Sequence, residues 1–306
     1  MSRHHVSPSH QSADRARATL FGPEVLPCLE FHGGRRRVHG LIECEIVRAI
    51  DRPDGFRMEI LDSRPYFVDA VHGVEIEDDL PAPGTPIAMA LGNTRPVEGR
   101  VEELGVHEED DGVRISLHAT VLDEARRQRV GPRDCRDLTV AEIARRLALD
   151  LGLRAQVDAN ESLVPVFELR EDPLRALRTL SRAHSMGLAL VADCLYLVHD
   201  LPAAGCVHDL GVVHPRGLVR FRMRHLLGAN AMPHRLIEVS LPGPVTASLL
   251  DQIRVRGYHA RCDGDYRLVR SHVRLTTEGW CSDLLLSEEA AASVSLDLPM
   301  GVGGDR

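Results

Sequence analysis

Three potential metal ligands lie close together in the sequence. Cys194, Cys206 and His208 are side-chain types that bind zinc, and a structural zinc site uses four such ligands in a tetrahedron. The sequence offers no obvious fourth ligand, and Cys194 falls in a predicted hairpin turn. We therefore expect no metal site, and the role of these three residues stays open at this stage.

Histidines and carboxylates are numerous, but their spacing does not match a catalytic pattern. None of the 16 histidines is paired at i, i+4 on a predicted helix with a carboxylate partner. His118 and His272 fall on the polar faces of predicted strands, where solvated or interfacial roles are expected. A catalytic acid needs a carboxyl group whose pKa is raised by burial or by a like-charged neighbour. The acidic clusters instead fall in predicted loops, either as solvated charge or as charge that biases a channel or docking surface: Glu75, Glu77, Asp78, Asp79, Glu108, Glu109, Asp110 and Asp111.

The sequence signatures of common catalytic sites are absent. The chain has no His-Glu-x-x-His, Gly-x-Ser-x-Gly, phosphate-loop or Gly-x-Gly-x-x-Gly pattern. We therefore expect no catalytic, no cofactor-binding and no metal-binding residue, and we do not expect an enzyme.

The composition indicates a globular protein with room for two or three domains. The chain has 306 residues and a net charge of −8, which argues against specific nucleic-acid binding; all 37 of its basic residues are Arg. No stretch approaches the ~20 apolar residues of a membrane helix. The N-terminus lacks the apolar core of a secretory signal, so we expect cytoplasmic synthesis.

The seven cysteines form no Cys-x-x-Cys pair, and free, mostly buried thiols are expected.

The middle of the chain, residues 137–200, has the clearest local signals. Thr139 and Glu142 form a capping box ahead of an apolar helical stripe, and Gly152 suits the helix C-terminus. A second helix is predicted to begin at Asp172-Pro173 and to end by Gly187. Two short apolar strands then flank a tight turn near Asp193.

Alternating apolar and polar residues predict β structure on both sides of this middle unit. Val113 to Val121 alternate strictly, and Val269 to Leu275 do so again. Asp51 to Gly55 is a predicted turn cluster. The expected divisions are a flexible arm at 1–19, a first β-barrel domain at 20–125, a small α/β domain at 126–206, a second β-barrel domain at 207–290 and a flexible tail at 291–306.

The order of these elements resembles the phage late control protein D family. The resemblance rests on Thr-Val-Ala-Glu-Ile at 139–143, Leu-Arg-Ala-Leu-Arg-Thr-Leu-Ser-Arg-Ala-His at 174–184 and Gly-Leu-Ala-Leu-Val-Ala-Asp-Cys-Leu-Tyr-Leu at 187–197, and the pattern extends over roughly 25–287. These are baseplate hub proteins of contractile tails, similar to the base of the type VI secretion spike. The resemblance implies a mainly β fold: two antiparallel tube-like β-barrels flanking a small α+β domain.

The resemblance also implies a function and partners. A homotrimer of two-barrel subunits is expected to connect a sixfold tail tube to a threefold spike. The implied partners are a tail tube or tube-initiator protein, a separate spike protein and, as a further candidate, the tape measure protein, with no membrane. The implied location is the virion tail, assembled in the host cytoplasm. Two alternatives stay open: a β-rich enzyme such as a peptidoglycan hydrolase, and a sugar- or peptide-binding β module.

Overall fold

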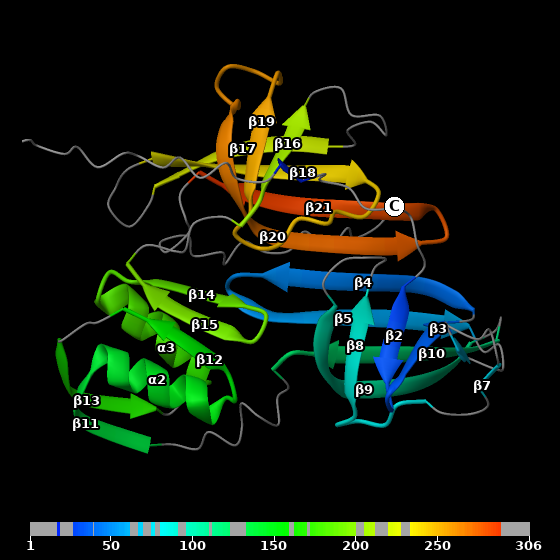
Figure 1. The fold of residues 1–306 in the computed structure, drawn as a ribbon, viewed down its shortest axis with the longest axis horizontal. Coiled ribbons are helices and arrows are strands. Elements are labelled where there is room, and N and C mark those ends of the chain that lie inside the picture. The colour runs from blue at the N-terminus through cyan, green and yellow to red at the C-terminus, as the bar shows by residue number, and fades with distance from the viewer. Residues whose placement is uncertain are drawn as a thin grey trace, which may run out of the picture.

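The structure is a computed structural model that is mainly β, with two α-helices among the described residues. We distinguish a first β region (27–122), an α/β unit (133–199) and a second β region (205–288) (Figure 1). Among the described residues, no helix combines the length and apolarity needed to cross a membrane. The expected arm and tail lie outside the described residues, apart from Arg17 and Ala18. The structure describes residues 17–18, 27–38, 40–61, 67–69, 75–76, 80–90, 96–109, 112–122, 133–158, 162–169, 172–199, 205–211, 220–227 and 233–288.

The first β region surrounds one apolar core. The alternation predicted at Val113 to Val121 is confirmed, because Ile115, Leu117 and Ala119 are buried while the residues between them are not. Phe56 and Met58 of the neighbouring strand enter the same core. The strands are β2 (Cys28–Phe31), β3 (Gly34–Val38), β4 (Leu41–Ala49), β5 (Arg52–Leu61), β6 (Phe67–Asp69), β7 (Glu75–Ile76), β8 (Pro86–Ala90), β9 (Val97–Glu109) and β10 (Gly112–Thr120).

The second β region surrounds a separate core. Ile237, Val239 and Tyr266 are buried there with Leu284 and Leu286. The N-terminal strand β1 (Arg17–Ala18) joins this region by pairing with β16. The other strands are β16 (Val207–Gly211), β17 (Arg220–Leu227), β18 (Pro233–Pro242), β19 (Gln252–Arg256), β20 (Gly264–Thr276) and β21 (Gly279–Ser287).

One run of antiparallel strands passes through both β regions. Its order is β17-β18-β21-β20-β4-β5-β10-β9, and most of these strands follow one another down the molecule in Figure 1. The strands of both regions form a single 16-stranded sheet. Within the described residues this sheet is open, so two separate closed barrels, as expected from the sequence, are not observed there.

Strand β20 is the element shared by the two regions. It has 13 residues, which corresponds to about 43 Å at ~3.3 Å per residue. Along one edge its residues 264–267 pair with β19, and its residues 270–275 pair with β4. The exchange of neighbours occurs at Val269, where the β20–β21 register also shifts. A bulge of this kind bends a strand, and here β20 pairs with β19 in one β region and with β4 in the other.

The α/β unit has the two predicted helices. The Thr139–Glu142 capping box is present, with Thr139 Oγ1 accepting the Glu142 N–H at 3.2 Å and Glu142 Oε2 accepting the Thr139 N–H at 2.8 Å. Asp172 caps the second helix, as predicted. The elements are β11 (Arg133–Thr139), α2 (Val140–Asp150), β12 (Arg154–Val157), β13 (Leu163–Leu169), α3 (Pro173–Ala183), β14 (Gly187–Val191) and β15 (Cys194–Val198).

A further apolar cluster connects the first β region, the α/β unit and the second β region. Ile50, at the end of β4, is buried together with Val269, Ala189, Val198 and Leu285. The Ile50 N–H donates to the Val269 carbonyl at 3.1 Å, and the Ile50 carbonyl accepts the Leu190 N–H at 2.8 Å. The β4–β5 turn is therefore clamped between β20 and the β14–β15 hairpin.

One sequence prediction is corrected by this fold, and one strand is added to those predicted. The predicted turn at Asp51–Gly55 is mostly strand, because β5 already begins at Arg52. Gly55 serves close packing there, since a Cβ on it would lie 3.0 Å from the Ala119 carbonyl oxygen. β11 is a strand that no local sequence signal predicted, and its Cys135 is buried against the α/β core.

Substitutions on α2 test its packing. Ile143 is 1% exposed, so Ile143→Asp buries an unpaired charge and is expected to cost roughly several kcal/mol. Thr139→Ala removes only the cap and should cost about 1 kcal/mol. Thermal unfolding of both variants measures the difference. Equal shifts of the unfolding midpoint would show that this helix does not pack as described.

Candidate assembly surface

Among the strands that the structure describes, each end of the eight-strand run has an edge without a partner strand. β17 pairs there with β18 alone. At the other end, β8 pairs with residues 97–100 of β9. β10 pairs over its whole length with residues 100–109 of β9. Among the described residues, β9 beyond Val101 thus has a strand on one side only. Free edges present rows of unpaired N–H and C=O groups, which are templates for another chain.

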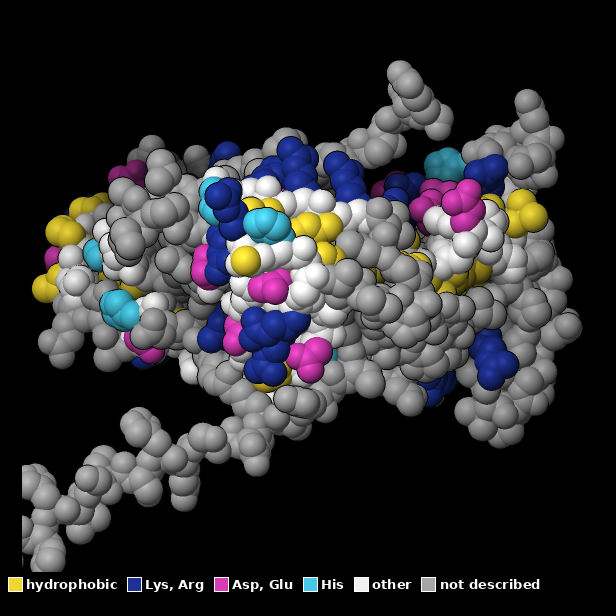
Figure 2. Space-filling model, turned by 90° about the horizontal axis from the view of Figure 1, so that it is seen from above, with side chains coloured by type: hydrophobic (Ala, Val, Ile, Leu, Met, Phe, Trp, Pro, Cys, Tyr) yellow, Lys and Arg dark blue, Asp and Glu magenta, His cyan; other side chains and the backbone are white. Residues whose placement is uncertain are grey.

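The exposed face of this run is charged, and the sign changes along it. In β17 the apolar Phe221 and Met223 pack against the second core, while Arg220 and Arg222 are exposed. The end of the molecule at the second β region also carries Arg side chains with acidic groups between them (Figure 2). On the first β region carboxylates predominate on this face: Glu43, Glu45, Glu59, Glu102 and Glu103.

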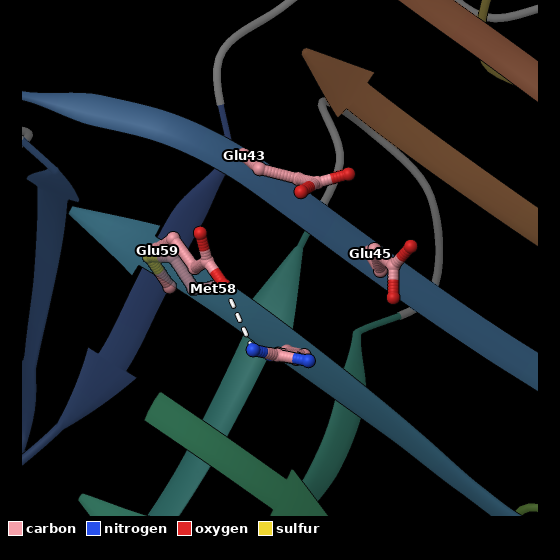
Figure 3. A pocket seen from close by; sticks show the side chains of 5 residues that line it. Glu43, Glu45, Met58 and Glu59 are labelled. Atoms are coloured by element: carbon pink, nitrogen blue, oxygen red, sulfur yellow. Dashed lines mark hydrogen bonds and ion pairs between the residues drawn. The ribbon is translucent and has the colours of Figure 1, made fainter. Parts of the chain in front are cut away.

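Three of these carboxylates surround a depression on β4 and β5. Glu43, Glu45 and Glu59 line it together with Arg57 and Met58 (Figure 3). Arg57 Nη2 donates to Glu59 Oε1 at 2.8 Å. Burial, and then the neighbouring Glu45 and Glu59 charges, raise the pKa of Glu43. Three carboxylates therefore gather around this depression, with Arg57 among the residues that line it.

Polar contacts connect β4, β20 and β21 across the shared strand. His272 Nε2 lies 3.4 Å from Glu45 Oε1, and this contact lowers the pKa of Glu45 against the opposing effect of burial. Arg274 Nη2 donates to Asp283 Oδ2 at 3.0 Å, and Ser240 Oγ donates to the other carboxylate oxygen. His272 was expected to be solvated or interfacial. Its side chain is 18% exposed and lies against the Glu45 carboxylate, so it is mostly buried within the chain.

A second polar group lies buried within the second β region. His208 is 3% exposed, and its Nε2 lies 3.0 Å from Asp251 Oδ2. Asp251 also accepts the backbone N–H groups of Cys206 and Ser248, at 3.2 and 2.9 Å. Burial raises the pKa of Asp251, but the hydrogen bonds from His208 and the two N–H groups outweigh it and the pKa is lowered overall. These contacts fasten β16 to the segment that precedes β19.

The three potential zinc ligands serve different elements. Cys194 begins β15 of the α/β unit, whereas Cys206 and His208 belong to the second β region. His208 is engaged with Asp251. Among the described residues no group of three or more His, Cys, Asp and Glu side chains is placed to hold a metal ion. All seven cysteines are free thiols, and four of them are buried.

The remaining predicted groups are only partly placed. His118 lies on the polar face with its Nδ1 3.3 Å from Glu102 Oε2. The side chains of Glu75, Glu77, Asp78, Asp79, Glu108, Glu109, Asp110 and Asp111 lie outside the described residues. Asp251 was missed, because it stands 43 positions from His208 and its sequence context carries no signal of that contact.

Solved structures with the same fold come from phage tails and a secretion system. The 43 kDa tail protein of prophage MuSo2 from Shewanella oneidensis is 12% identical, with a TM-score of 0.61 over 85% of this chain and 96% of that chain. A tail protein from Neisseria meningitidis MC58 is 13% identical, with a TM-score of 0.60 over 87% of this chain and 97% of that chain. The fold of this chain is therefore that of phage tail proteins.

A third similar structure is the E. coli c3393 protein. It is described as a component of the type VI secretion system with structural similarity to the T4 bacteriophage tail proteins gp27 and gp5. It is 11% identical, with a TM-score of 0.62 over 84% of this chain and 76% of that chain. No protein-family model and no curated protein matches the sequence.

The buried carboxylate gives a pH-dependent prediction. The pKa of Asp251 in the folded chain lies below its ordinary value of 3.8, so its contribution to stability is present above about pH 4 and is lost as the pH falls through the lowered pKa. Asp251→Asn should lower the free energy of unfolding at pH 7 by about 2 kcal/mol. The difference from the parent should shrink below about pH 4.

Asp265→Asn is the matched control for this measurement. Asp265 is 44% exposed and its ion pairs with Arg254 and Arg256 lie at the surface, so the change should cost at most ~0.5 kcal/mol. Denaturant unfolding at several pH values measures both variants. A loss for Asp251→Asn that is as small as the control, or that persists unchanged at pH 3, would contradict the assigned role.

Proposed function

We propose that this chain is a structural hub protein of a phage tail or tail-like injection machine, of the late control protein D type. In this role it connects a sixfold tail tube to a threefold spike as a homotrimer. The observation that carries the proposal is the single antiparallel run from β17 to β9, with an edge at each end that has no partner strand in the described part of the chain. The fold shared with tail proteins and a secretion component supports the same role.

The two free edges are complementary. β17 presents Arg220 and Arg222, and β9 presents Glu103 on the same face of the sheet. Val106 of β9 is 64% exposed and offers apolar surface beside that edge. Head-to-tail contact between copies places basic residues against acidic ones and covers both edges. A head-to-tail contact that returns on itself closes a ring instead of growing into a filament.

Three copies satisfy both symmetries. Each chain contributes two β regions with cores of their own, so a ring of three presents six of them to a sixfold tube. The same ring keeps threefold symmetry toward the spike. The proposed partners are therefore the tail tube or a tube-initiator protein on one side and a separate spike protein on the other. The tape measure protein is a further candidate, and the location is the tail of the virion or machine.

The proposed role is structural, not enzymatic. The Arg274–Asp283 and His208–Asp251 contacts connect strands and segments of the fold, which is a structural use of polar groups. The depression lined by Glu43, Glu45 and Glu59 suits a contact with a cationic side chain of a neighbouring subunit.

Electron cryomicroscopy of particles that contain this chain tests the proposal. We expect three copies in one ring between tube and spike, with β17 of each copy beside β9 of the next. Six copies, or a single copy, would overturn the proposed symmetry match.

Charge reversal tests the proposed edges in solution. Arg220→Glu with Arg222→Glu should weaken association of the purified chain by about tenfold or more, because like charges then meet at the edge. Adding Glu103→Arg should restore part of the loss. Arg256→Glu, an exposed change on β19, is the matched control and should leave the association unchanged. Equal association of all variants, measured by sedimentation, would show that these edges do not meet.

A further inference from the structure

A third strand edge lies away from both ends of the eight-strand run. β16 pairs in parallel with β19 over all five of its residues, Val207–Gly211. On its other side it pairs with β1, and only Val207 and His208 take part. The outer edge of β16 is therefore occupied by the chain's own N-terminal segment over part of its length.

This edge is held in place from several directions. The His208–Asp251 contact anchors the middle of β16 from within the core. At its end, the Tyr258 hydroxyl donates to the Gly211 carbonyl at 3.1 Å, and the Tyr258 ring stacks on Phe221 with centroids 4.7 Å apart. A rigid strand with a fixed row of N–H and C=O groups is a preformed template for an added strand.

The outward direction of that row follows from one hydrogen bond. The Gln252 N–H of β19 donates to the Cys206 carbonyl at 3.0 Å. In a parallel ladder the backbone groups of alternate residues face opposite neighbours. His208 and Leu210 therefore direct their N–H and C=O groups toward β19, and Val207 and Asp209 direct theirs toward the outer edge.

The strand that occupies the edge is short. β1 contributes two residues, and the net stabilisation from so few hydrogen bonds is comparable to the entropy lost in ordering the segment. β2, the next strand along the chain, belongs to the first β region, which lies below the second in Figure 1. The pairing of β1 with β16 therefore adds little net stability to the fold.

We propose that the outer edge of β16 is a strand-acceptor site whose ligand is the chain's own N-terminal segment around Arg17 and Ala18, bound in parallel as a removable strap. Bound, the strap covers an edge that would otherwise pair with another chain. Released, it leaves a template for an extended segment. The site is separate from the β17 and β9 edges, so it does not depend on the proposed ring.

A peptide-binding experiment on the free chain tests this site. The probe is a fluorescent peptide of residues 12–24, and the receptors are the full chain and a variant that lacks residues 1–19. The peptide should bind the truncated variant at least about tenfold more tightly than the full chain, because the intramolecular strap competes at a high effective concentration. Fluorescence anisotropy gives both affinities.

Two controls make the result specific. A truncation of residues 1–14 keeps β1 and should behave as the full chain does. A peptide with Arg17→Pro and Ala18→Pro loses the N–H groups that a ladder needs and should not bind. Equal affinity of the probe for the full chain and the truncated variant, or no binding to a folded truncated variant, would overturn the proposal.

A second variant covers the case in which the truncated chain does not fold. The full chain with Arg17→Pro and Ala18→Pro keeps its length but cannot hold the strap, and it should bind the unmodified peptide as the truncated variant is expected to. Failure of this variant to bind would refute the acceptor site. Either result leaves the copy number in the assembled ring untouched, so the two proposals fail independently.

Discussion

The pairing of β4 with β20 is the contact on which the rest of the structure depends. Six residues of β20, from Arg270 to Leu275, pair with β4, while the same strand continues into the second β region as the partner of β19. The change of partner at Val269 aligns the side chains so that Tyr266 and Leu268 enter one core and Val273 enters the other. Two cores are thereby fixed to one strand without a flexible linker between them.

The α/β unit reinforces this contact from one end. Ile50 lies where β4 turns into β5, and its backbone is bonded to both Val269 and Leu190. Arg178 of α3 donates to the carbonyl of Asp51 in the same turn. Because all three parts meet at Ile50, movement of either β region would open a buried cluster. Buried apolar clusters of this kind have a definite packing, which favours a rigid subunit with edges at fixed positions.

Local features of this fold could be predicted from the sequence, and distant ones could not. The capping box at Thr139 and the alternation at Val113–Val121 depend on neighbours in the chain, and both are confirmed. The shared use of β20 depends on a pairing with β4 more than 200 positions away, which no local pattern encodes. β11 was missed for a related reason: its burial at Cys135 comes from contact with α2 and β13, not from its own Arg-rich sequence.

The candidate site shows the same division between local and distant information. The polar positions of His118 and His272 followed from alternation, but their carboxylate partners lie on other strands. Cys194, Cys206 and His208 are close in sequence yet belong to separate parts of the fold, since a hairpin and a domain boundary intervene. The resemblance to late control proteins predicted the tail-protein fold, which the similar structures share, because it uses the order of whole elements instead of single residues.

Hydrogen exchange across the β4–β20 contact tests this account most directly. If the two β regions form one rigid subunit, backbone amides of residues 44–49 and 270–275 will exchange as slowly as those of the two cores, for example 115–119 and 237–241. Mass spectrometry of the free chain resolves these segments. Faster exchange at 44–49 and 270–275 than in both cores would show that the regions separate at this contact, and would contradict a subunit with edges at fixed positions.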